Sequence, residues 1–270
     1  MQKIDLTNIK KEKIENHTSK GDQPKWRIGN KWYKADHMGY EALAEYVVSE
    51  LLKKSNVHNF VAYDLVKIKY DNKTSVGCVS DNFKEDYEML VPLEKLHRQY
   101  FGKGLSSAIA EKESITDKII YAVEFVEKVT GLKNVGEYLA TMLAVDAFFL
   151  NEDRHTNNIA VIRNEKTKKF RFAPIFDNGL SLLSDTNDYT FDCDIYDNIK
   201  KVQAKPFDRS FDEQLNAVEE LYGSQLEFNF KKSDVYKILD ELKVVYDEKI
   251  VERVEQVLLQ QIRKYQYLFR

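Results

Sequence analysis

One stretch of the sequence and a short motif after it decide the fold. The stretch is Asn151-Glu152-Asp153-Arg154-His155-Thr156-Asn157-Asn158, and the motif is Asp177-Asn178-Gly179. Between them, apolar and polar side chains alternate on both sides of a polar turn at residues 164–168, which predicts two strands joined as a hairpin. Because a hairpin returns the chain toward its start, we expect Asn158 and Asp177 to lie side by side.

These residue types at this spacing suit phosphoryl transfer. That reaction needs a carboxylate near the attacking hydroxyl, hard oxygen ligands for Mg²⁺ and a cation on the phosphates. In protein kinases an Asn follows the catalytic Asp by five residues, and a second Asp lies in an Asp-x-Gly turn. We therefore predict that Asp153 is the catalytic base and that Asn158 and Asp177 are the magnesium ligands.

Each motif has a simpler interpretation when it is taken alone. Asp153-Arg154-His155 is compatible with a solvated loop, and Asp177-Asn178-Gly179 with a type I′ turn. Both motifs occur together on either side of a predicted hairpin, and this combination favours a catalytic site over the two simpler interpretations. We predict that Arg154 contacts solvent or phosphate, that His155 hydrogen-bonds the loop backbone, and that Gly179 lets the chain turn sharply after the metal ligand.

The rest of the chain predicts an α+β fold with two lobes. A hairpin at residues 26–34, a helix at 41–54 and strands at 61–69 and 74–79 form a small β-rich N-terminal lobe. The larger C-terminal lobe is mainly helical, with helices predicted at 93–100, 116–130, 135–150, 211–222, 233–245 and 248–269. We place the nucleotide-binding lobe at residues 1–83 and the catalytic lobe at 84–270, with residues 1–20 peripheral and Ser233 as a helix N-cap.

Composition narrows the function classes. The chain has 270 residues and a net charge of −3, which argues against a dedicated nucleic-acid binder. No stretch has the ~20 apolar residues of a membrane span, and the two cysteines, Cys78 and Cys193, make no disulfide framework. We expect a cytoplasmic protein, with secretion as an effector into a host cytosol left open. The aspartates between residues 185 and 197 are expected to form a solvated segment.

At these motifs the sequence resembles the HipA-like serine/threonine kinases, and within them the short, CtkA-like members. The resemblance lies in residues 146–158 and in the run Phe172-Ala173-Pro174-Ile175-Phe176-Asp177-Asn178-Gly179. Lys205-Pro206-Phe207 also echoes an element of that family. Phosphatidylinositol kinases share the Asp-Arg-His-x-x-Asn string. The resemblance implies a bilobal protein-kinase-like fold that uses Mg²⁺ and ATP.

The same resemblance assigns further nucleotide-binding residues. Lys34 matches the family's phosphate-binding lysine on a strand, and Glu45 matches its helix glutamate. Glu41 is a rival for Glu45, since both lie on one helix at i, i+4 spacing. Residues 18–23 resemble the phosphate loop, in which Gly21 would approach the phosphates and Ser19 would be autophosphorylated. The adenine would sit near Ser80 and Asp81.

The function implied is that of a Mg-ATP-dependent serine/threonine protein kinase. A protein substrate is expected, its identity open, and an antitoxin or regulatory partner is a further expectation. Two alternatives stay open: a lipid or small-molecule kinase with the same core, and a nucleotide-binding pseudokinase that acts as an interaction module.

Overall fold

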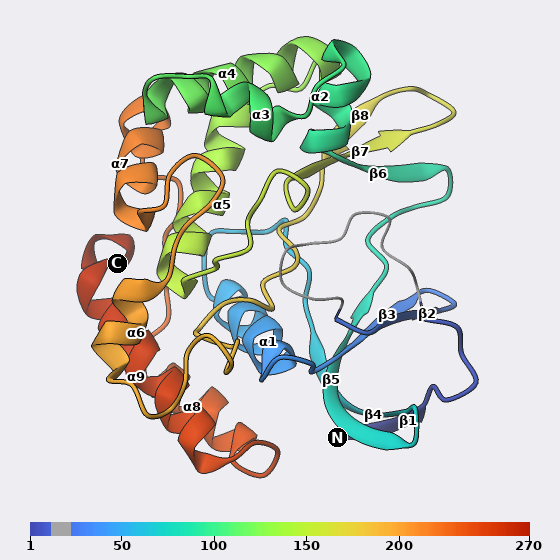
Figure 1. Cartoon of the computed structure of the whole chain (residues 1–270), viewed down its shortest axis with the longest axis vertical. Helices are drawn as coiled ribbons and strands as arrows, with labels where there is room; N and C mark the ends of the chain where they lie inside the picture. The colour runs from blue at the N-terminus through green and yellow to red at the C-terminus, as the bar shows by residue number, and fades with distance from the viewer. Residues whose placement is uncertain (12–22) are drawn as a thin grey trace. The chain divides into compact units, whose positions relative to one another are not determined.

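The computed structural model describes residues 1–11 and 23–270, and the chain divides into two compact units (Figure 1). Unit 1 comprises Met1–Asn82, Asp177–Val202 and Glu227–Arg270. Unit 2 comprises Phe83–Phe176 and Gln203–Leu226. Each unit is therefore assembled from separate stretches of the chain. The lobes placed at residues 1–83 and 84–270 stay a prediction.

Unit 1 contains a five-stranded sheet with the strand order β1-β4-β5-β3-β2. Its strands are β1 (Gln2–Asp5), β2 (Lys25–Ile28), β3 (Lys31–Ala35), β4 (Asp64–Tyr70) and β5 (Lys73–Asp81). β1 pairs in parallel with β4, and the other neighbours are antiparallel. The expectation of a merely peripheral N-terminus was wrong for its first residues, because β1 joins the sheet and the next residue, Leu6, is fully buried in the core under it.

Helices complete unit 1: α1 (Glu41–Leu52), α6 (Ile195–Lys201), α8 (Lys232–Leu242), α9 (Glu248–Lys264) and a 3₁₀ helix at Gln266–Leu268. α1 packs against β3, β4 and β5, with its predicted apolar face buried. The N-cap of α8 is Lys231, not the predicted Ser233, and the Asp234 carboxylate accepts a hydrogen bond from the Lys231 backbone N–H at 2.8 Å.

A half-buried carboxyl group, Asp36, links the loop before α1 to the segment between α8 and α9. One of its oxygens accepts a hydrogen bond from the Ala42 backbone N–H at 2.6 Å, and the other from the Tyr246 hydroxyl at 2.8 Å. Burial, together with the nearby Glu41 charge, raises the pKa of Asp36 to about 8, although the two hydrogen bonds act in the opposite direction. The folded protein therefore holds this proton far more tightly than an unfolded chain would.

We expect Asp36→Asn to stabilise the protein increasingly as the pH rises. The unfolded carboxyl loses its proton near pH 4 and the folded one near pH 8, so wild-type stability falls through this window. Asn keeps an acceptor for Ala42 without a charge. Urea unfolding at several pH values should show the gain growing up to pH 8, on the order of 2–5 kcal/mol. Asp86→Asn is the control, since Asp86 is an exposed carboxylate. A gain independent of pH would contradict the prediction.

Unit 2 combines a three-stranded antiparallel sheet, in the order β6-β7-β8, with helices. Its strands are β6 (Glu88–Pro92), β7 (Ala160–Asn164) and β8 (Phe170–Phe172). Its helices are α2 (Leu93–Phe101), α3 (Leu105–Ala110), α4 (Ile115–Thr130), α5 (Val135–Phe149) and α7 (Phe211–Tyr222). The hairpin predicted between residues 158 and 176 is confirmed as β7 and β8.

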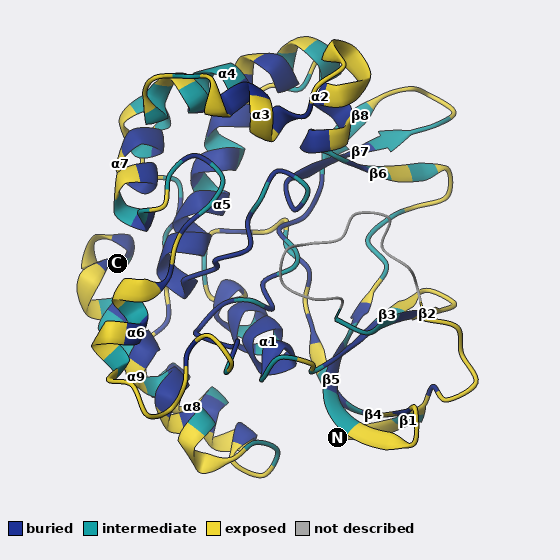
Figure 2. Cartoon of the chain, in the orientation of Figure 1, coloured by how far each residue is buried: buried dark blue, intermediate teal, exposed yellow. Residues whose placement is uncertain are grey.

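α5 is the central helix of unit 2. It is buried along almost its whole length (Figure 2), and it packs against α4 and α7. An apolar helix that is covered on all sides leads directly into the loop after Phe149, so the start of that loop is anchored in the core. None of the helices in the described part of the chain has the length and apolar character needed to cross a membrane.

Candidate active site

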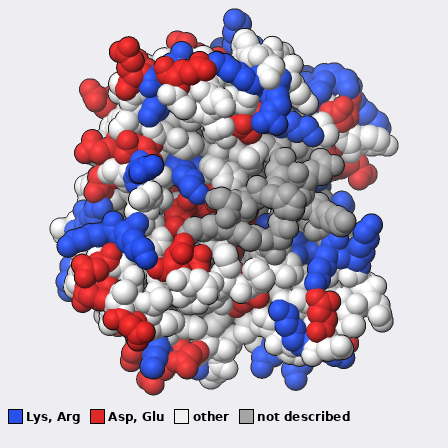
Figure 3. Space-filling model, in the orientation of Figure 1, with Lys and Arg blue, Asp and Glu red and all other residues white. Residues whose placement is uncertain are grey.

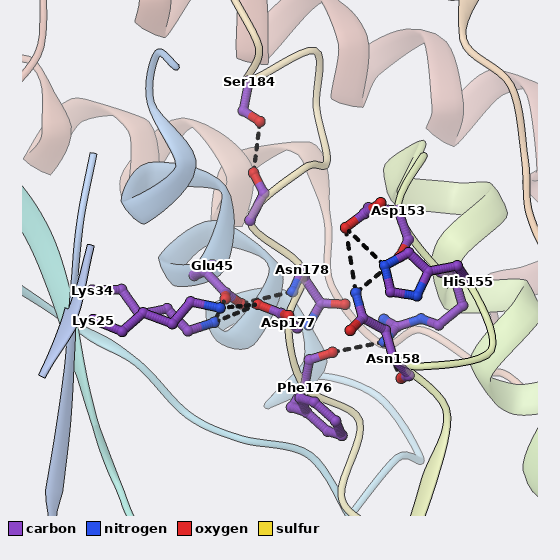
Figure 4. Close-up of polar contacts among 12 residues, drawn as sticks. Lys25, Lys34, Glu45, Asp153, His155, Asn158, Phe176, Asp177, Asn178 and Ser184 are labelled. Carbon is purple, nitrogen blue, oxygen red and sulfur yellow. Dashed lines mark hydrogen bonds and ion pairs between the residues drawn. The ribbon is translucent and has the colours of Figure 1, made fainter. Parts of the chain in front are cut away.

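In unit 1, Lys34 lies between two carboxylates (Figure 4). Its Nζ is 2.5 Å from Glu45 Oε1 and 2.7 Å from Asp177 Oδ1. The Lys34 side chain is 11% exposed and that of Glu45 is fully buried. Three residues predicted from the sequence thus meet within one unit: Lys34, Glu45 and Asp177. Asp177 is far from the other two in the sequence.

The rival glutamate has another contact. The Glu41 carboxylate accepts backbone N–H bonds from His37, Met38 and Gly39, so it holds the turn that leads into α1. Glu45, one helical turn later, is the glutamate that contacts Lys34. Periodicity could not choose between the two because both point toward the same side of the helix.

The charges around Lys34 favour its protonated form. Burial opposes a charged ammonium group, but Asp177 and Glu45 outweigh it and raise the pKa of Lys34 well above its usual value. Lys34 therefore stays a cation throughout the physiological pH range. A permanently charged, enclosed ammonium group beside a carboxylate is suited to hold an anionic phosphate chain.

Sequence reasoning missed a second cation, Lys25. It lies on β2 directly opposite Lys34 in the β2–β3 register, so both side chains project from the same face of the sheet. Its Nζ is 3.7 Å from Asp177 Oδ1. The hairpin predicted at residues 26–34 begins one residue after Lys25, and extending its register by one pair places Lys25 opposite Lys34.

The backbone at Asp177-Asn178-Gly179 is fixed from two sides. The Asn178 N–H donates to Glu45 Oε2 at 2.9 Å, and the Gly179 carbonyl accepts from the Ser184 hydroxyl at 2.6 Å. The chain turns at Gly179-Leu180, as predicted, but Gly179 does not use the positive φ that glycine adopts readily. Asp177 itself takes the left-handed conformation, with φ of 61°. That conformation aims the Asp177 carboxylate at Lys34.

In unit 2, the loop after α5 is built around a buried ion pair. Arg154 is completely buried and makes hydrogen bonds of 2.9–3.1 Å to both oxygens of Asp146. Its other amino group donates to the backbone carbonyls of Asn158 and Phe176. The expectation that Arg154 faces solvent or phosphate was therefore wrong. Arg154 ties both ends of the segment that carries the predicted catalytic residues.

We expect Arg154→Met to destabilise the protein by about 3–5 kcal/mol, because it leaves the Asp146 carboxylate buried without its cation. Chemical denaturation measures the loss. The matched control is Arg98→Met, which removes a cation whose side chain is 63% exposed and 3.3 Å from Glu94. An exposed pair of that kind contributes less than ~1 kcal/mol. Equal losses in the two variants would contradict the prediction.

Asp153 and Asn158 meet inside this loop (Figure 4). Asn158 Nδ2 donates to the Asp153 carbonyl at 2.9 Å and lies 3.4 Å from Asp153 Oδ2. His155 Nε2 is 3.5 Å from the same oxygen, while His155 Nδ1 accepts the Asn157 N–H, which confirms the predicted backbone contact of the ring. Lys205 Nζ is 3.4 Å from the other oxygen, Asp153 Oδ1.

A buried glutamate supports the same loop from α2. The Glu94 carboxylate accepts hydrogen bonds from the Thr156 hydroxyl at 2.7 Å and from the Ser106 backbone N–H at 2.8 Å. Burial opposes its charge, but these hydrogen bonds prevail and lower the pKa of Glu94. Glu94 thus ties Thr156, three residues after Asp153, to the start of α3. Only the structure showed this role.

The oxygen atoms of Asn158 and Asp177 fit the chemistry of Mg²⁺, which prefers hard ligands. Because Asn158 Nδ2 is held by the Asp153 carbonyl, Oδ1 is the atom that can act as a ligand. Within residues 1–11 and 23–270, no group of three or more His, Cys, Asp or Glu side chains could hold a metal. Mg²⁺ is usually bound through one or two protein ligands, with substrate phosphates and water completing its coordination.

The remaining predicted residues are placed as follows. Gly21 and Ser19 lie outside the described residues, as does most of the predicted phosphate loop. Ser80 and Asp81 are the last residues of β5; Ser80 is buried opposite Trp32, and Asp81 is exposed and paired with Lys31 at 2.9 Å. Charged side chains of both signs lie near one another over much of the face in Figure 3. The adenine site stays a prediction.

Comparison with solved structures identifies the fold of the chain. No family model matches the sequence, and no curated protein matches it. Among solved structures, the crystal structure of the Helicobacter pylori proinflammatory kinase CtkA matches with a TM-score of 0.62 and 19% identity, over 97% of this chain and 94% of that one. The chain has a kinase-like fold.

The prediction of an α+β, kinase-like fold, with a β-rich N-terminal region and a larger helical part, is thereby confirmed. A choline/ethanolamine kinase family protein from Mesorhizobium loti also matches, with a TM-score of 0.28 and 12% identity over 96% of this chain and 80% of that one. The identity to CtkA is too low to transfer more than the fold.

Proposed function

We propose that this chain is a Mg-ATP-dependent serine/threonine protein kinase. The observation that carries the proposal is the contact of Lys34 with both Glu45 and Asp177. Protein kinases need a lysine–glutamate ion pair and an aspartate metal ligand to be in place together. The pairing of Asp153 with Asn158 supplies the second set of groups that this chemistry needs.

Each residue has a defined task in the proposed reaction. Lys34 holds the phosphates, and Glu45 holds Lys34. Asn158 and Asp177 would hold Mg²⁺, which neutralises charge on the phosphates when it is bound. Asp153 orients the attacking hydroxyl and accepts its proton as the oxygen bonds to the γ-phosphorus, the bond to the bridging oxygen breaks and ADP leaves. The proposal requires both sets of residues to act on one nucleotide.

The choice of a protein hydroxyl as acceptor rests on the resemblance at residues 146–158 and 172–179. The overall match to a protein described as a proinflammatory kinase supports the fold that such a reaction uses. A protein substrate, autophosphorylation at Ser19, a regulatory partner and action in a cytosol belong to the same proposal.

Incubation of the purified protein with γ-labelled ATP and Mg²⁺, alone and with a cell lysate, tests the proposal. We expect label in protein, at serine or threonine. Label confined to lipid or to a small molecule would replace the protein acceptor and leave the kinase chemistry. ATP binding without label in any acceptor, and without hydrolysis, would overturn the proposal in favour of a pseudokinase.

A further inference from the structure

Lys205 is held in place by the backbone on both sides. The Ala204 N–H donates to the Arg209 carbonyl at 2.8 Å and closes the loop that contains Lys205. Within that loop, Phe207 is 2% exposed; its N–H donates to Gln214 at 3.1 Å, and its carbonyl accepts from Lys118 at 3.0 Å. All these residues belong to unit 2. The position of the Lys205 backbone is therefore set by the core of the unit that carries Asp153.

The Lys205 side chain reaches the carboxylate of the proposed base. Its Nζ lies 3.4 Å from Asp153 Oδ1, whereas Asn158 and His155 face Oδ2. The Lys205 side chain is 35% exposed and that of Asp153 only 10%. The ammonium group thus lies beside a largely buried carboxylate, on a side chain that solvent can reach.

The negative charge of a phosphoryl group in transfer explains why a cation is useful beside Asp153. In phosphoryl transfer the group in flight is metaphosphate-like, with negative charge spread over three oxygens, and the attacking hydroxyl lies beside the base. Lys205 Nζ is 3.4 Å from Asp153 Oδ1, so it is a cation beside the base at which the attacking hydroxyl would lie. Lysine suits the role, since its ammonium is a compact charge with three donors that can turn.

We propose that Lys205 is a catalytic residue that contacts the transferring γ-phosphoryl group. The inference rests on the proposed kinase function. During transfer, the substrate oxygen bonds to phosphorus, the bond to the β–γ bridging oxygen breaks, the proton passes to Asp153 and ADP carries the electron pair away. Lys205 exchanges no proton in this step. It stabilises the charge on the moving phosphoryl oxygens.

The contacts of Lys205 do not support a purely structural role for its side chain. Because the Lys205 side chain is 35% exposed, solvent screens its charge and limits what the ion pair adds to stability. The loop is already fixed by its own backbone bonds and by buried Phe207. Removing the ammonium group should therefore change the reaction rate and leave the fold intact.

The test compares wild type with Lys205→Met, which keeps the chain length of the side chain and removes its charge. Hydrolysis of Mg-ATP and label transfer to protein are both followed, so that the readout does not depend on a known substrate. We expect kcat to fall about 100-fold, with the KM for ATP changed less than about threefold, because the contact strengthens in the transition state. Lys205→Arg should retain part of the rate.

Two comparisons separate chemistry from structure. Lys103→Met removes another lysine of an exposed ion pair in unit 2, 2.6 Å from Glu111, and should leave kcat unchanged. In Lys205→Ala, added methylamine or ethylamine should restore part of the rate by placing an ammonium group in the vacated space. A fall in rate without rescue, together with a lowered Tm, would make Lys205 structural and overturn the inference.

The inference also fails if Lys205→Met keeps kcat within about threefold of wild type. That outcome leaves the kinase function standing, because the wild type is active in the same assay. A wild type that binds ATP but neither hydrolyses nor transfers it overturns the proposed function and the role of Lys205 with it.

Discussion

The Asp153→Asn variant is expected to bind Mg-ATP as the wild type does and to lose about two to four orders of magnitude in transfer rate. Asn has nearly the same size and keeps an oxygen near Lys205, but it cannot take the proton of the attacking hydroxyl. The shorter contact of Asn158 is with the Asp153 backbone carbonyl, at 2.9 Å, and that contact survives the substitution, whereas the side-chain contact to Oδ2 is longer, at 3.4 Å. The loss should therefore appear in kcat.

Single-turnover kinetics measure the transfer rate, and a separate titration measures the affinity for Mg-ATP. Asp86→Asn is the matched control, since Asp86 is an exposed carboxylate of the same unit and should leave both unchanged. Transfer by Asp153→Asn at the wild-type rate would remove Asp153 from the role of base. Loss of nucleotide binding as well would mean that the residue acts before chemistry.

The Asp177→Asn variant is expected to lose most of the magnesium dependence of nucleotide binding. Asp177 is a proposed ligand of the ion, and even the partners of metal ligands typically contribute 10–100-fold to metal affinity, so we expect a loss of at least that order. Asn is preferred to Ala here, because residue 177 has φ of 61° and Asn tolerates that conformation better. Backbone strain in an Ala variant could itself lower nucleotide binding and would be mistaken for loss of a metal ligand.

Calorimetric titration of ATP with Mg²⁺ and with EDTA gives the ratio of affinities. Asp71→Asn is the control, since Asp71 also has a positive φ, of 45°, but lies in the β4–β5 turn. Without metal, wild type and Asp177→Asn should bind ATP with similar affinity. If the ratio in Asp177→Asn equals that of wild type, Asp177 is no metal ligand.

Local patterns in the sequence predicted much of the fold. The helix at residues 135–149 follows from a long apolar run and the helix at 211–222 from apolar periodicity. The β7–β8 hairpin follows from alternation around a polar turn. These signals lie within a few consecutive residues. The parallel strand β1 was missed because its partner, β4, lies about sixty residues away and its own residues are mostly polar.

The segment at residues 185–201 shows a missed local signal. Asp188, Asp192, Asp194 and Asp197 are exposed, as expected of a solvated stretch, but Asp185 is 4% exposed. The expectation also missed a helix, since Asp194 caps α6 by accepting the Tyr196 N–H. An aspartate followed by lysines at 200 and 201 is a helix start and stop pattern that the count of acidic residues hid.

The candidate site could be predicted where residue types alone carry the chemistry. Lys34, Glu45 and Asp177 were named from the sequence, and they meet in unit 1. Residues that act by position were missed, because their roles depend on tertiary partners. Arg154 needs Asp146 on the preceding helix, Glu94 needs Thr156, and Lys25 needs the register of β2 with β3.

The composition of unit 1 from distant stretches has a consequence for its synthesis. Phe228 pairs with Ser55 on one side and with Phe269 on the other, so three parts of the chain meet in one place. At roughly 5–20 residues per second, a ribosome needs tens of seconds to pass from the first of these residues to the last. During that time the N-terminal sheet lacks its C-terminal partners, whereas unit 2 is complete once Leu226 has emerged. We expect unit 2 to be the first part of the nascent chain to resist proteases.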